Sequence, residues 1–171
     1  LMIEQLSYIS KYAQRGKISP PEMQPISINL ITNFTDDILE RVLGGMCLAN
    51  GIYPTITRVP YRQYAMAFKN KQSPIYNSKP DISFIFFDAS HFRYSEFLHP
   101  QHRDEVIAGI KEYIEHISGI IVVNLFALPY QGAYGLFFSE EPLFRALDDF
   151  NNKLVTLTKE KYNLKIFELS K

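Results

Sequence analysis

The sequence predicts an α/β fold, a three-layer flavodoxin-like sandwich with a five-stranded parallel sheet between two layers of helices. Short segments rich in β-branched and aliphatic residues alternate along the chain with longer segments whose apolar residues have helical spacing. In addition, the chain turns polar directly after several of the apolar segments, which is typical of the carboxyl edge of a parallel sheet.

Composition fits a single domain with a core of its own. The chain has 171 residues, of which 46% are hydrophobic and 21% charged. Lys plus Arg and Asp plus Glu each total 18, so the formal net charge is zero, which argues against a nucleic-acid partner. Cys47 is the one cysteine and cannot form an internal disulfide, so we expect a reducing, cytoplasmic setting. No apolar run approaches the roughly 18 residues of a membrane span, and we expect no membrane partner.

The pattern divides the chain into a leading segment and one α/β unit. Residues 1–25 are expected to form a short amphipathic helix, over 3–14, and a linker that contains Ser19-Pro20-Pro21. Residues 26–171 are expected to form the α/β domain, excised from a longer protein. The expected strands are 26–32, 53–59, 82–87, 120–124 and 163–167. The expected helices are 36–49, 99–116 and 139–161, and 61–71 is expected to be a helix or an irregular turn. A loop is expected at 73–76 and a long aromatic loop at 125–138. Right-handed crossovers then favour the strand order 2-1-3-4-5.

In this strand order the winding direction reverses between the first and third strands, and ligands usually bind at such a point. The first strand runs into Thr32-Asn33-Phe34-Thr35 and the third into Asp88-Ala89-Ser90-His91, while Asn124 ends the fourth. The predicted binding residues are therefore Asn33, Phe34, Thr35, Asp88, Ser90, His91 and Asn124. A structural alternative stays open for each, because Asn33 or Thr35 could cap the following helix and Asp88 a short helix of its own.

Several familiar chemistries lack their residues. The turn after the first strand has no glycine, as a dinucleotide or P-loop fingerprint would require, and Gly44-Gly45 falls within a helix. No Gly-x-Ser-x-Gly elbow occurs. His91, His99 and His102 lie near Asp88 in sequence but across a loop and a helix start, which favours a surface cluster over a zinc site. We expect neither a metal nor a cofactor in this chain.

Five segments follow one another over nearly the whole chain: Asn33-Phe34-Thr35, Gly51-Ile52-Tyr53-Pro54, Pro60-Tyr61-Arg62-Gln63-Tyr64, Ser73-Pro74-Ile75-Tyr76 and Lys79-Pro80-Asp81. In this order they resemble the N-terminal region of FkbH-like proteins. In that family an SGNH-hydrolase-like domain precedes a haloacid-dehalogenase-type phosphatase domain of subclass IIIC. The resemblance implies a flavodoxin-like sandwich. It also implies a link to polyketide biosynthesis, where the family loads a glycerate-derived unit onto an acyl carrier protein.

The same resemblance implies a dismantled hydrolase site. Asn33 falls where SGNH hydrolases have their nucleophilic serine, and an amide cannot form an acyl intermediate. Pro60 falls near the oxyanion glycine and has no N–H, and Asp88 falls near the oxyanion asparagine. We find neither an Asp-x-x-His near the C-terminus nor the Asp-x-Asp-x-Thr of the phosphatase domain. The resemblance thus implies a non-catalytic platform whose partners are a phosphatase-type domain of the same protein, which would hold Mg²⁺, and an acyl carrier.

Aromatic residues gather around the predicted site edge. Tyrosines suit interfaces that are apolar on one side and wet on the other, and arginines suit phosphates. The interface candidates are Tyr61, Arg62, Tyr64, Arg93, Tyr130 and Tyr134, with Tyr76, Phe92 and Tyr94 nearby. For these rings, packing as ordinary core remains an alternative. For the chain as a whole, a second alternative is an interaction module without a small-molecule pocket. A third is an active esterase that uses Ser90 with His91.

Overall fold

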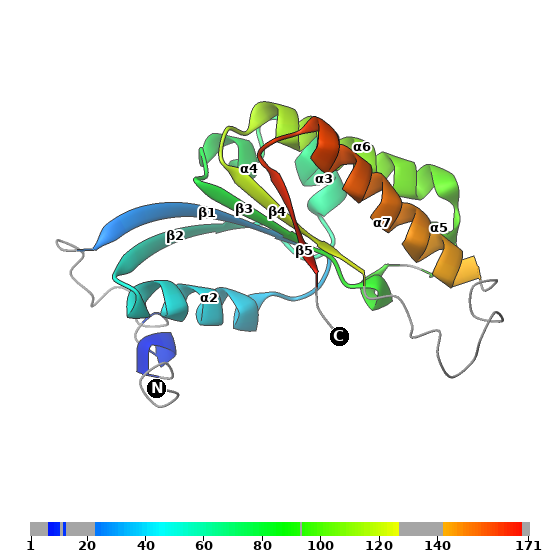
Figure 1. The fold of residues 1–171 in the computed structure, drawn as a ribbon. Helices are drawn as coiled ribbons and strands as arrows, with labels where there is room; N and C mark the ends of the chain where they lie inside the picture. Colours follow the sequence, from blue (N-terminus) through cyan, green and yellow to red (C-terminus); the bar gives the residue numbers. More distant parts are fainter. Residues whose placement is uncertain (1–6, 11, 13–22, 93, 127–141, 169–171) are drawn as a thin grey trace.

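The computed structural model describes residues 7–10, 12, 23–92, 94–126 and 142–168. Its centre is a five-stranded sheet in the order β2-β1-β3-β4-β5, in which all four neighbouring pairs are parallel (Figure 1). The predicted fold class and strand order are confirmed. The strands are β1 (Gln24–Thr32), β2 (Ile52–Arg58), β3 (Ile82–Phe86), β4 (Ile120–Leu125) and β5 (Leu164–Glu168).

Helices cover the sheet unequally on its two faces. Figure 1 shows α2 on one side, with the helical residues 7–10 and 12 beyond it, and α3, α4, α6 and α7 on the other. Residues 7–10 and 12 lie within the helix predicted over 3–14, of which the rest is outside the described residues. The helices are α2 (Asp37–Ala49), α3 (Tyr64–Lys69), α4 (Pro74–Asn77), α5 (Tyr94–Leu98), α6 (Pro100–His116) and α7 (Pro142–Glu160).

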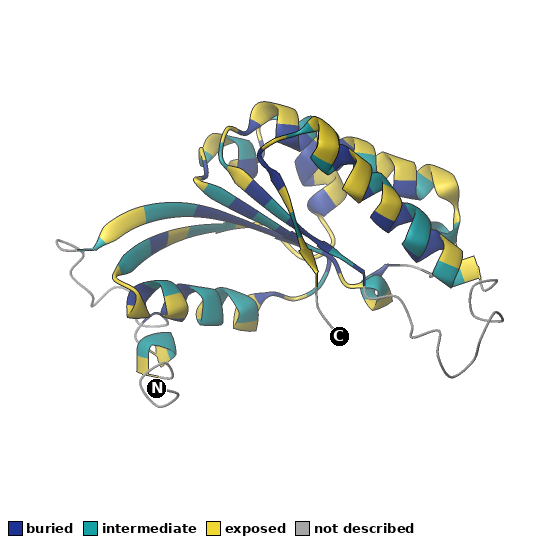
Figure 2. Cartoon of the chain, in the orientation of Figure 1, coloured by how far each residue is buried: buried dark blue, intermediate teal, exposed yellow. Residues whose placement is uncertain are grey.

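The main core lies between the sheet and the layer of α3, α6 and α7. Alternate residues of the strands point into it, because successive side chains of a strand face opposite sides. Figure 2 shows the result as buried stripes along the strands and exposed outer surfaces on α6 and α7. Fully buried members of this core include Ile31, Phe68, Ile85, Ile110, Tyr113, Ile121, Phe150 and Leu154.

Two segments between β2 and β3 need a more exact description than the sequence allowed. The segment 61–71, expected to be a helix or an irregular turn, contains both: Arg62 has a φ of 61°, outside the helical range, and α3 begins at Tyr64. The loop predicted over 73–76 contains a helical turn, α4, which begins at Pro74, where the ring's fixed φ suits a first turn. Within the described residues, no helix is both long enough and apolar enough to cross a membrane.

Candidate functional site

Asn33 lies directly beyond β1, at the point where the winding direction reverses. Its side chain is buried, with 1% exposure, and its amide binds both backbone groups of Asp88. The Asn33 Nδ2 donates to the Asp88 carbonyl oxygen, and the Asp88 N–H donates to Asn33 Oδ1, each over 2.8 Å. Since Thr32 and Phe86 form the last pair between β1 and β3, the amide continues the ladder past the strand ends. Asn33 is therefore a structural bridge between the two strands.

Two further asparagines repeat this arrangement along the same edge. Asn124 accepts from the Phe87 N–H at 2.8 Å and donates to the Phe87 carbonyl at 2.9 Å, which ties β4 to the end of β3. Asn151 of α7 accepts from the Phe126 N–H and donates to its carbonyl, both at 2.9 Å. The sequence analysis missed Asn151. Its position, a polar residue on the apolar side of a helix, could have identified it.

The helix caps at this edge differ in part from the prediction. Neither Asn33 nor Thr35 caps α2; its N-cap is Asp36, which makes no side-chain cap bond. The Asn33 amide is instead engaged by the Asp88 backbone, so it cannot serve as a cap. Asp88 does cap a short 3₁₀ turn (Ala89–His91), accepting from the Ser90 N–H at 2.8 Å, which is the structural alternative that the sequence left open for this residue.

Asp88, Ser90 and His91 contact one another at the exposed rim of the edge. The Ser90 hydroxyl donates to Asp88 Oδ1 at 2.8 Å and lies 3.2 Å from His91 Nδ1, while the same Nδ1 lies 3.5 Å from Asp88 Oδ2. Burial alone would raise the pKa of Asp88, but bonds from Ser90 and the nearby His91 outweigh it and lower that pKa. The Phe34 ring packs at 6.0 Å from the His91 ring.

This contact set lacks the geometry of a serine relay. In a relay the histidine takes the hydroxyl proton with one ring nitrogen while the carboxylate holds the other nitrogen. Here both contacts use His91 Nδ1, and the Ser90 hydroxyl gives its hydrogen bond to the carboxylate. In this arrangement the three residues fix a turn, and the Ser90 hydroxyl is engaged by the carboxylate.

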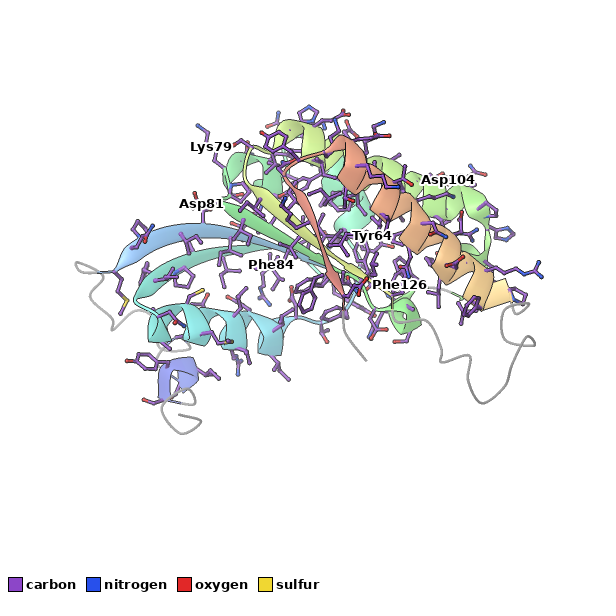
Figure 3. All side chains as sticks on the ribbon, in the orientation of Figure 1. Tyr64, Lys79, Asp81, Phe84, Asp104 and Phe126 are labelled. Atoms are coloured by element: carbon purple, nitrogen blue, oxygen red, sulfur yellow. The ribbon has the colours of Figure 1, made fainter. Side chains whose placement is uncertain are left out.

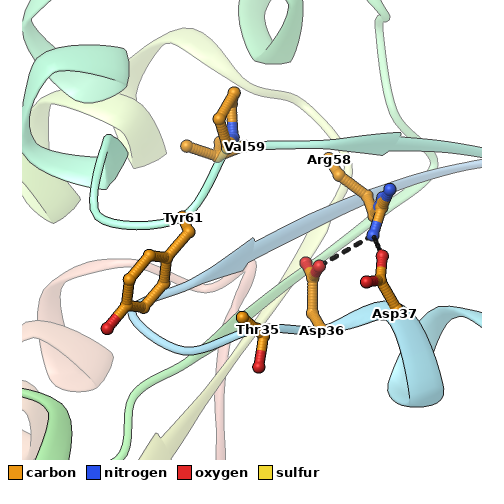
Figure 4. A pocket seen from close by; sticks show the side chains of 7 residues that line it. Thr35, Asp36, Asp37, Arg58, Val59 and Tyr61 are labelled. Atoms are coloured by element: carbon orange, nitrogen blue, oxygen red, sulfur yellow. Dashed lines mark hydrogen bonds and ion pairs between the residues drawn. The ribbon is translucent and has the colours of Figure 1, made fainter.

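An open pocket of about 450 Å³ lies at the carboxyl ends of β1 and β2, next to the β1–β3 edge that holds Asn33 and Asp88 (Figure 4). Of the predicted binding residues Thr35 alone lines it, and of the predicted interface residues Tyr61 alone. The lining residues are Thr35, Asp36, Asp37, Arg58, Val59, Pro60 and Tyr61.

Arg58 organises the charges of this pocket. Its Nη1 lies 2.9 Å from Asp36 Oδ1 and also binds Asp37, and its Nε lies 3.1 Å from Glu40 Oε2. Burial raises the pKa of Asp36 despite Arg58, whereas the hydrogen bond to Arg58 lowers the pKa of Asp37. Three carboxylates around one guanidinium leave the wall negative, which disfavours a phosphate here. The sequence analysis missed Arg58, the charged last residue of β2.

The predicted interface residues have different surroundings. Tyr61 is 43% exposed, and the Arg62 guanidinium lies 5.0 Å from its ring centroid. The prediction of Tyr64 as an interface residue is wrong, because Tyr64 is buried at 8% exposure and packs against Phe87 and Phe92. Arg93, Tyr130 and Tyr134 lie outside the described residues, as does the side chain of Tyr94. In the part of the chain that the structure describes, no three His, Cys, Asp or Glu side chains are arranged to hold a metal ion.

Comparison with known proteins gives a likeness of fold. No family model and no curated protein matches the sequence. A solved structure, the N-terminal part of BF1531 from Bacteroides fragilis, containing a phosphatase domain and complexed with Mg, matches with a TM-score of 0.72 and 14% identity. The match covers 94% of this chain and 45% of that one, so this chain spans less than half of that structure. At this identity the match shows the fold alone, in agreement with the flavodoxin-like sheet order.

Proposed function

We propose that this chain is a non-catalytic, degenerate SGNH-like domain, the N-terminal part of an FkbH-like protein. Its role is to give a platform for a haloacid-dehalogenase-type phosphatase domain of the same polypeptide. The observation that carries the proposal is the Asn33 amide, bound on both sides to the Asp88 backbone and closed off from solvent. A residue in that state holds two strands together and is not available to attack a substrate.

The other positions of the inferred hydrolase site support the same reading. Pro60 at the pocket wall has no N–H to give to an oxyanion. Asp88 has a lowered pKa and is therefore negative at neutral pH, where it would repel an oxyanion. Nucleophile and donors are thus replaced together, as expected of a site kept for architecture.

The likeness to BF1531 supports a second domain. That structure contains a phosphatase domain, and the match with this chain covers 45% of it. We therefore retain the division into an N-terminal helix and linker over 1–25 and an SGNH-like domain over 26–171, joined to a phosphatase-type domain that would hold Mg²⁺. Because the pocket wall is negative, we assign substrate or acyl-carrier contact to the rim that Ser90 and His91 form. Arg62, exposed after β2, is a further candidate for this contact.

Esterase assays separate this function from the active-esterase alternative. We expect the purified chain to hydrolyse p-nitrophenyl acetate no faster than buffer containing an equal concentration of free imidazole. Turnover above that level which disappears in Ser90→Ala and persists in Ser95→Ala, a matched exposed serine, would establish the esterase and end the proposal.

The platform itself is tested by the coding sequence and by titration. An Asp-x-Asp-x-Thr segment after a strand beyond Lys171 supports the proposal, and a stop codon there overturns it. In a second experiment, backbone amide shifts are followed while acyl carrier protein, phosphopantetheine or a glycerate phosphate is added. Shifts at Ser90 and His91 with the small molecules support a ligand-facing rim, whereas shifts with the carrier protein alone indicate a module without a small-molecule site.

A further inference from the structure

Among the described residues, helices cover the α2 side of the sheet over β1 and β2 but not over the other strands. Under α2, Ile28 and Leu30 of β1 are 1% and 0% exposed. On the same side of β4 and β5, Ile120 is 50% exposed and Phe167 47% exposed. Figure 1 shows α2 alongside β1 and β2, with no drawn helix of the described residues beneath β3, β4 and β5.

The strand alternation identifies which residues form this uncovered area. Ser83 bonds to Tyr113 of α6, and Ile85 lies in the core on that side, so their neighbours in β3 face the α2 side. Figure 3 shows Phe84 on that side. The same alternation applies to β4 around Ile121 and to β5 around Leu164. We call the resulting surface the aromatic face; it comprises Ile82, Phe84, Phe86, Ile120, Val122 and Phe167.

The aromatic face is continuous across its three strands. The Phe84 and Phe86 rings lie 5.4 Å apart, and the Phe86 and Phe167 rings, from β3 and β5, lie 6.0 Å apart. Two exposed apolar side chains of α2, Ile38 at 78% and Met46 at 51%, add to the apolar surface of this layer. Around the axis of α2, Ile38 and Met46 lie on a different side from Glu40, which pairs with Arg58, and from Gly44, which contacts Tyr12.

This exposure is at odds with the physics of parallel sheets. Such sheets occur almost always with both faces covered, and monomeric proteins rarely expose large contiguous apolar patches. A helix is about 10 Å wide and strands are about 4.8 Å apart, so one helix covers about two strands. Helix α2 accounts for β1 and β2, and the remaining strands have room for one further helix beside it.

We propose that the aromatic face is the docking surface for a helix of the second domain. This inference rests on the proposed function, which joins that domain to this chain in one polypeptide. The likeness to BF1531, in which this fold accounts for 45% of the solved chain, supports further polypeptide beside it. The exposed Lys165 points to the same side as Phe167, so the occupant is a helix with an apolar stripe and an acidic residue opposite Lys165.

Cysteine protection tests the proposal on the intact polypeptide. In a Cys47→Ser background, Ile120→Cys and Phe167→Cys place a thiol on the aromatic face, and Met66→Cys places one on α3 in the opposite layer, where Met66 is 62% exposed. All three native side chains are about half exposed or more, so the substitutions leave the core intact. The rate of maleimide modification is measured for each variant in the 1–171 chain and in the full polypeptide.

We expect Ile120→Cys and Phe167→Cys to react at least tenfold more slowly in the full polypeptide than in the 1–171 chain, with Met66→Cys unchanged. If Ile120→Cys and Phe167→Cys each react at the same rate in the full polypeptide as in the 1–171 chain, the inference is overturned and the proposed function stays intact. Protection already present in the 1–171 chain that disappears on dilution would show a second copy as the occupant and also overturn it. A stop codon after Lys171 would remove both proposals. Esterase turnover would remove the non-catalytic role in the proposed function.

Discussion

The ring of Tyr12 lies against Gly44 of α2 so closely that a Cβ at residue 44 would be 2.5 Å from three ring atoms. Tyr12 is 4% exposed, and its hydroxyl donates to Glu40 Oε1 at 3.3 Å. Because Glu40 also pairs with Arg58, the N-terminal helical residues are linked to the pocket wall through one carboxylate. Gly44 is thus required by the approach of an aromatic ring and not by the helix that contains it.

Gly44→Ala is expected to destabilise the chain although alanine is the better helix former. The gain in helix propensity is about 1 kcal/mol, whereas forcing the ring away costs about 1–3 kcal/mol. Urea denaturation of both proteins measures the difference. In a Tyr12→Ala background the same substitution should become neutral or stabilising. A stabilising Gly44→Ala with Tyr12 in place would contradict the packing described.

The Asn33 bridge predicts a large effect of a nearly isosteric change. Asn33→Asp keeps the size but loses the N–H donor to the Asp88 carbonyl and buries a carboxylate beside it. We expect a loss of about 3 kcal/mol in the free energy of unfolding, measured by denaturant titration at neutral pH. Asn50→Asp is the matched control, since the exposed Asn50 side chain donates one bond, to the Met46 carbonyl. Equal losses for the two variants would remove the bridging role of Asn33.

The Arg103–Asp149 pair predicts a loss of stability in acid. Arg103 is 6% exposed and its Nε lies 2.9 Å from Asp149 Oδ2, which Lys153 also contacts at 2.9 Å. Burial would raise the pKa of Asp149, but bonds from Lys153 and Arg103 outweigh it and lower that pKa below its ordinary value of 3.8. A carboxyl with a lowered folded-state pKa stabilises the fold above its unfolded pKa, and this stability is lost as the pH falls through the folded value.

Asp149→Asn should therefore reduce the loss of unfolding free energy between about pH 6 and pH 3, while lowering stability at pH 6 by about 1–2 kcal/mol. Asp148→Asn, one residue earlier, is the control for removing a carboxylate from the same turn of α7 without touching the Arg103 pair. The measurement is urea denaturation at a series of pH values. An unchanged slope in Asp149→Asn would show that the pair does not contribute to acid sensitivity.

The fold could be predicted from sequence because its signals are local or follow general rules. Strands such as Ile82–Phe86 are uncharged apolar runs, and right-handed crossovers leave few possible orders. Boundaries moved where one residue adopts an unusual backbone, as at Arg62. The edge that holds the candidate site was also predictable, since parallel strands end together.

The roles at that edge were not predictable, because they depend on contacts between distant residues. From the sequence, Asn33 can be interpreted as a helix cap. The structure shows that it binds Asp88, which is 55 residues later in the chain. Arg58 reads as a strand end until the parallel register brings it to Asp36 and Glu40. The aromatic face reads as core, since Phe84 and its neighbours sit in apolar strands whose covering layer the sequence does not specify.

The hydroxyl of Tyr113 predicts a coupling between two buried residues. Tyr113 is 0% exposed; its hydroxyl accepts from Asn29 Nδ2 at 2.7 Å and lies 2.8 Å from Ser83 Oγ. Tyr113→Phe removes the partner of a buried serine, while Asn29 Nδ2 keeps its bond to the Ile75 carbonyl at 2.7 Å. We expect each of Tyr113→Phe and Ser83→Ala to cost about 1–2 kcal/mol and the double variant to cost about 1 kcal/mol less than their sum. Urea denaturation of the four proteins closes the cycle. Strictly additive losses would show that the two hydroxyls do not bond, whereas coupling of that size would mean that they form one polar unit between β3 and α6.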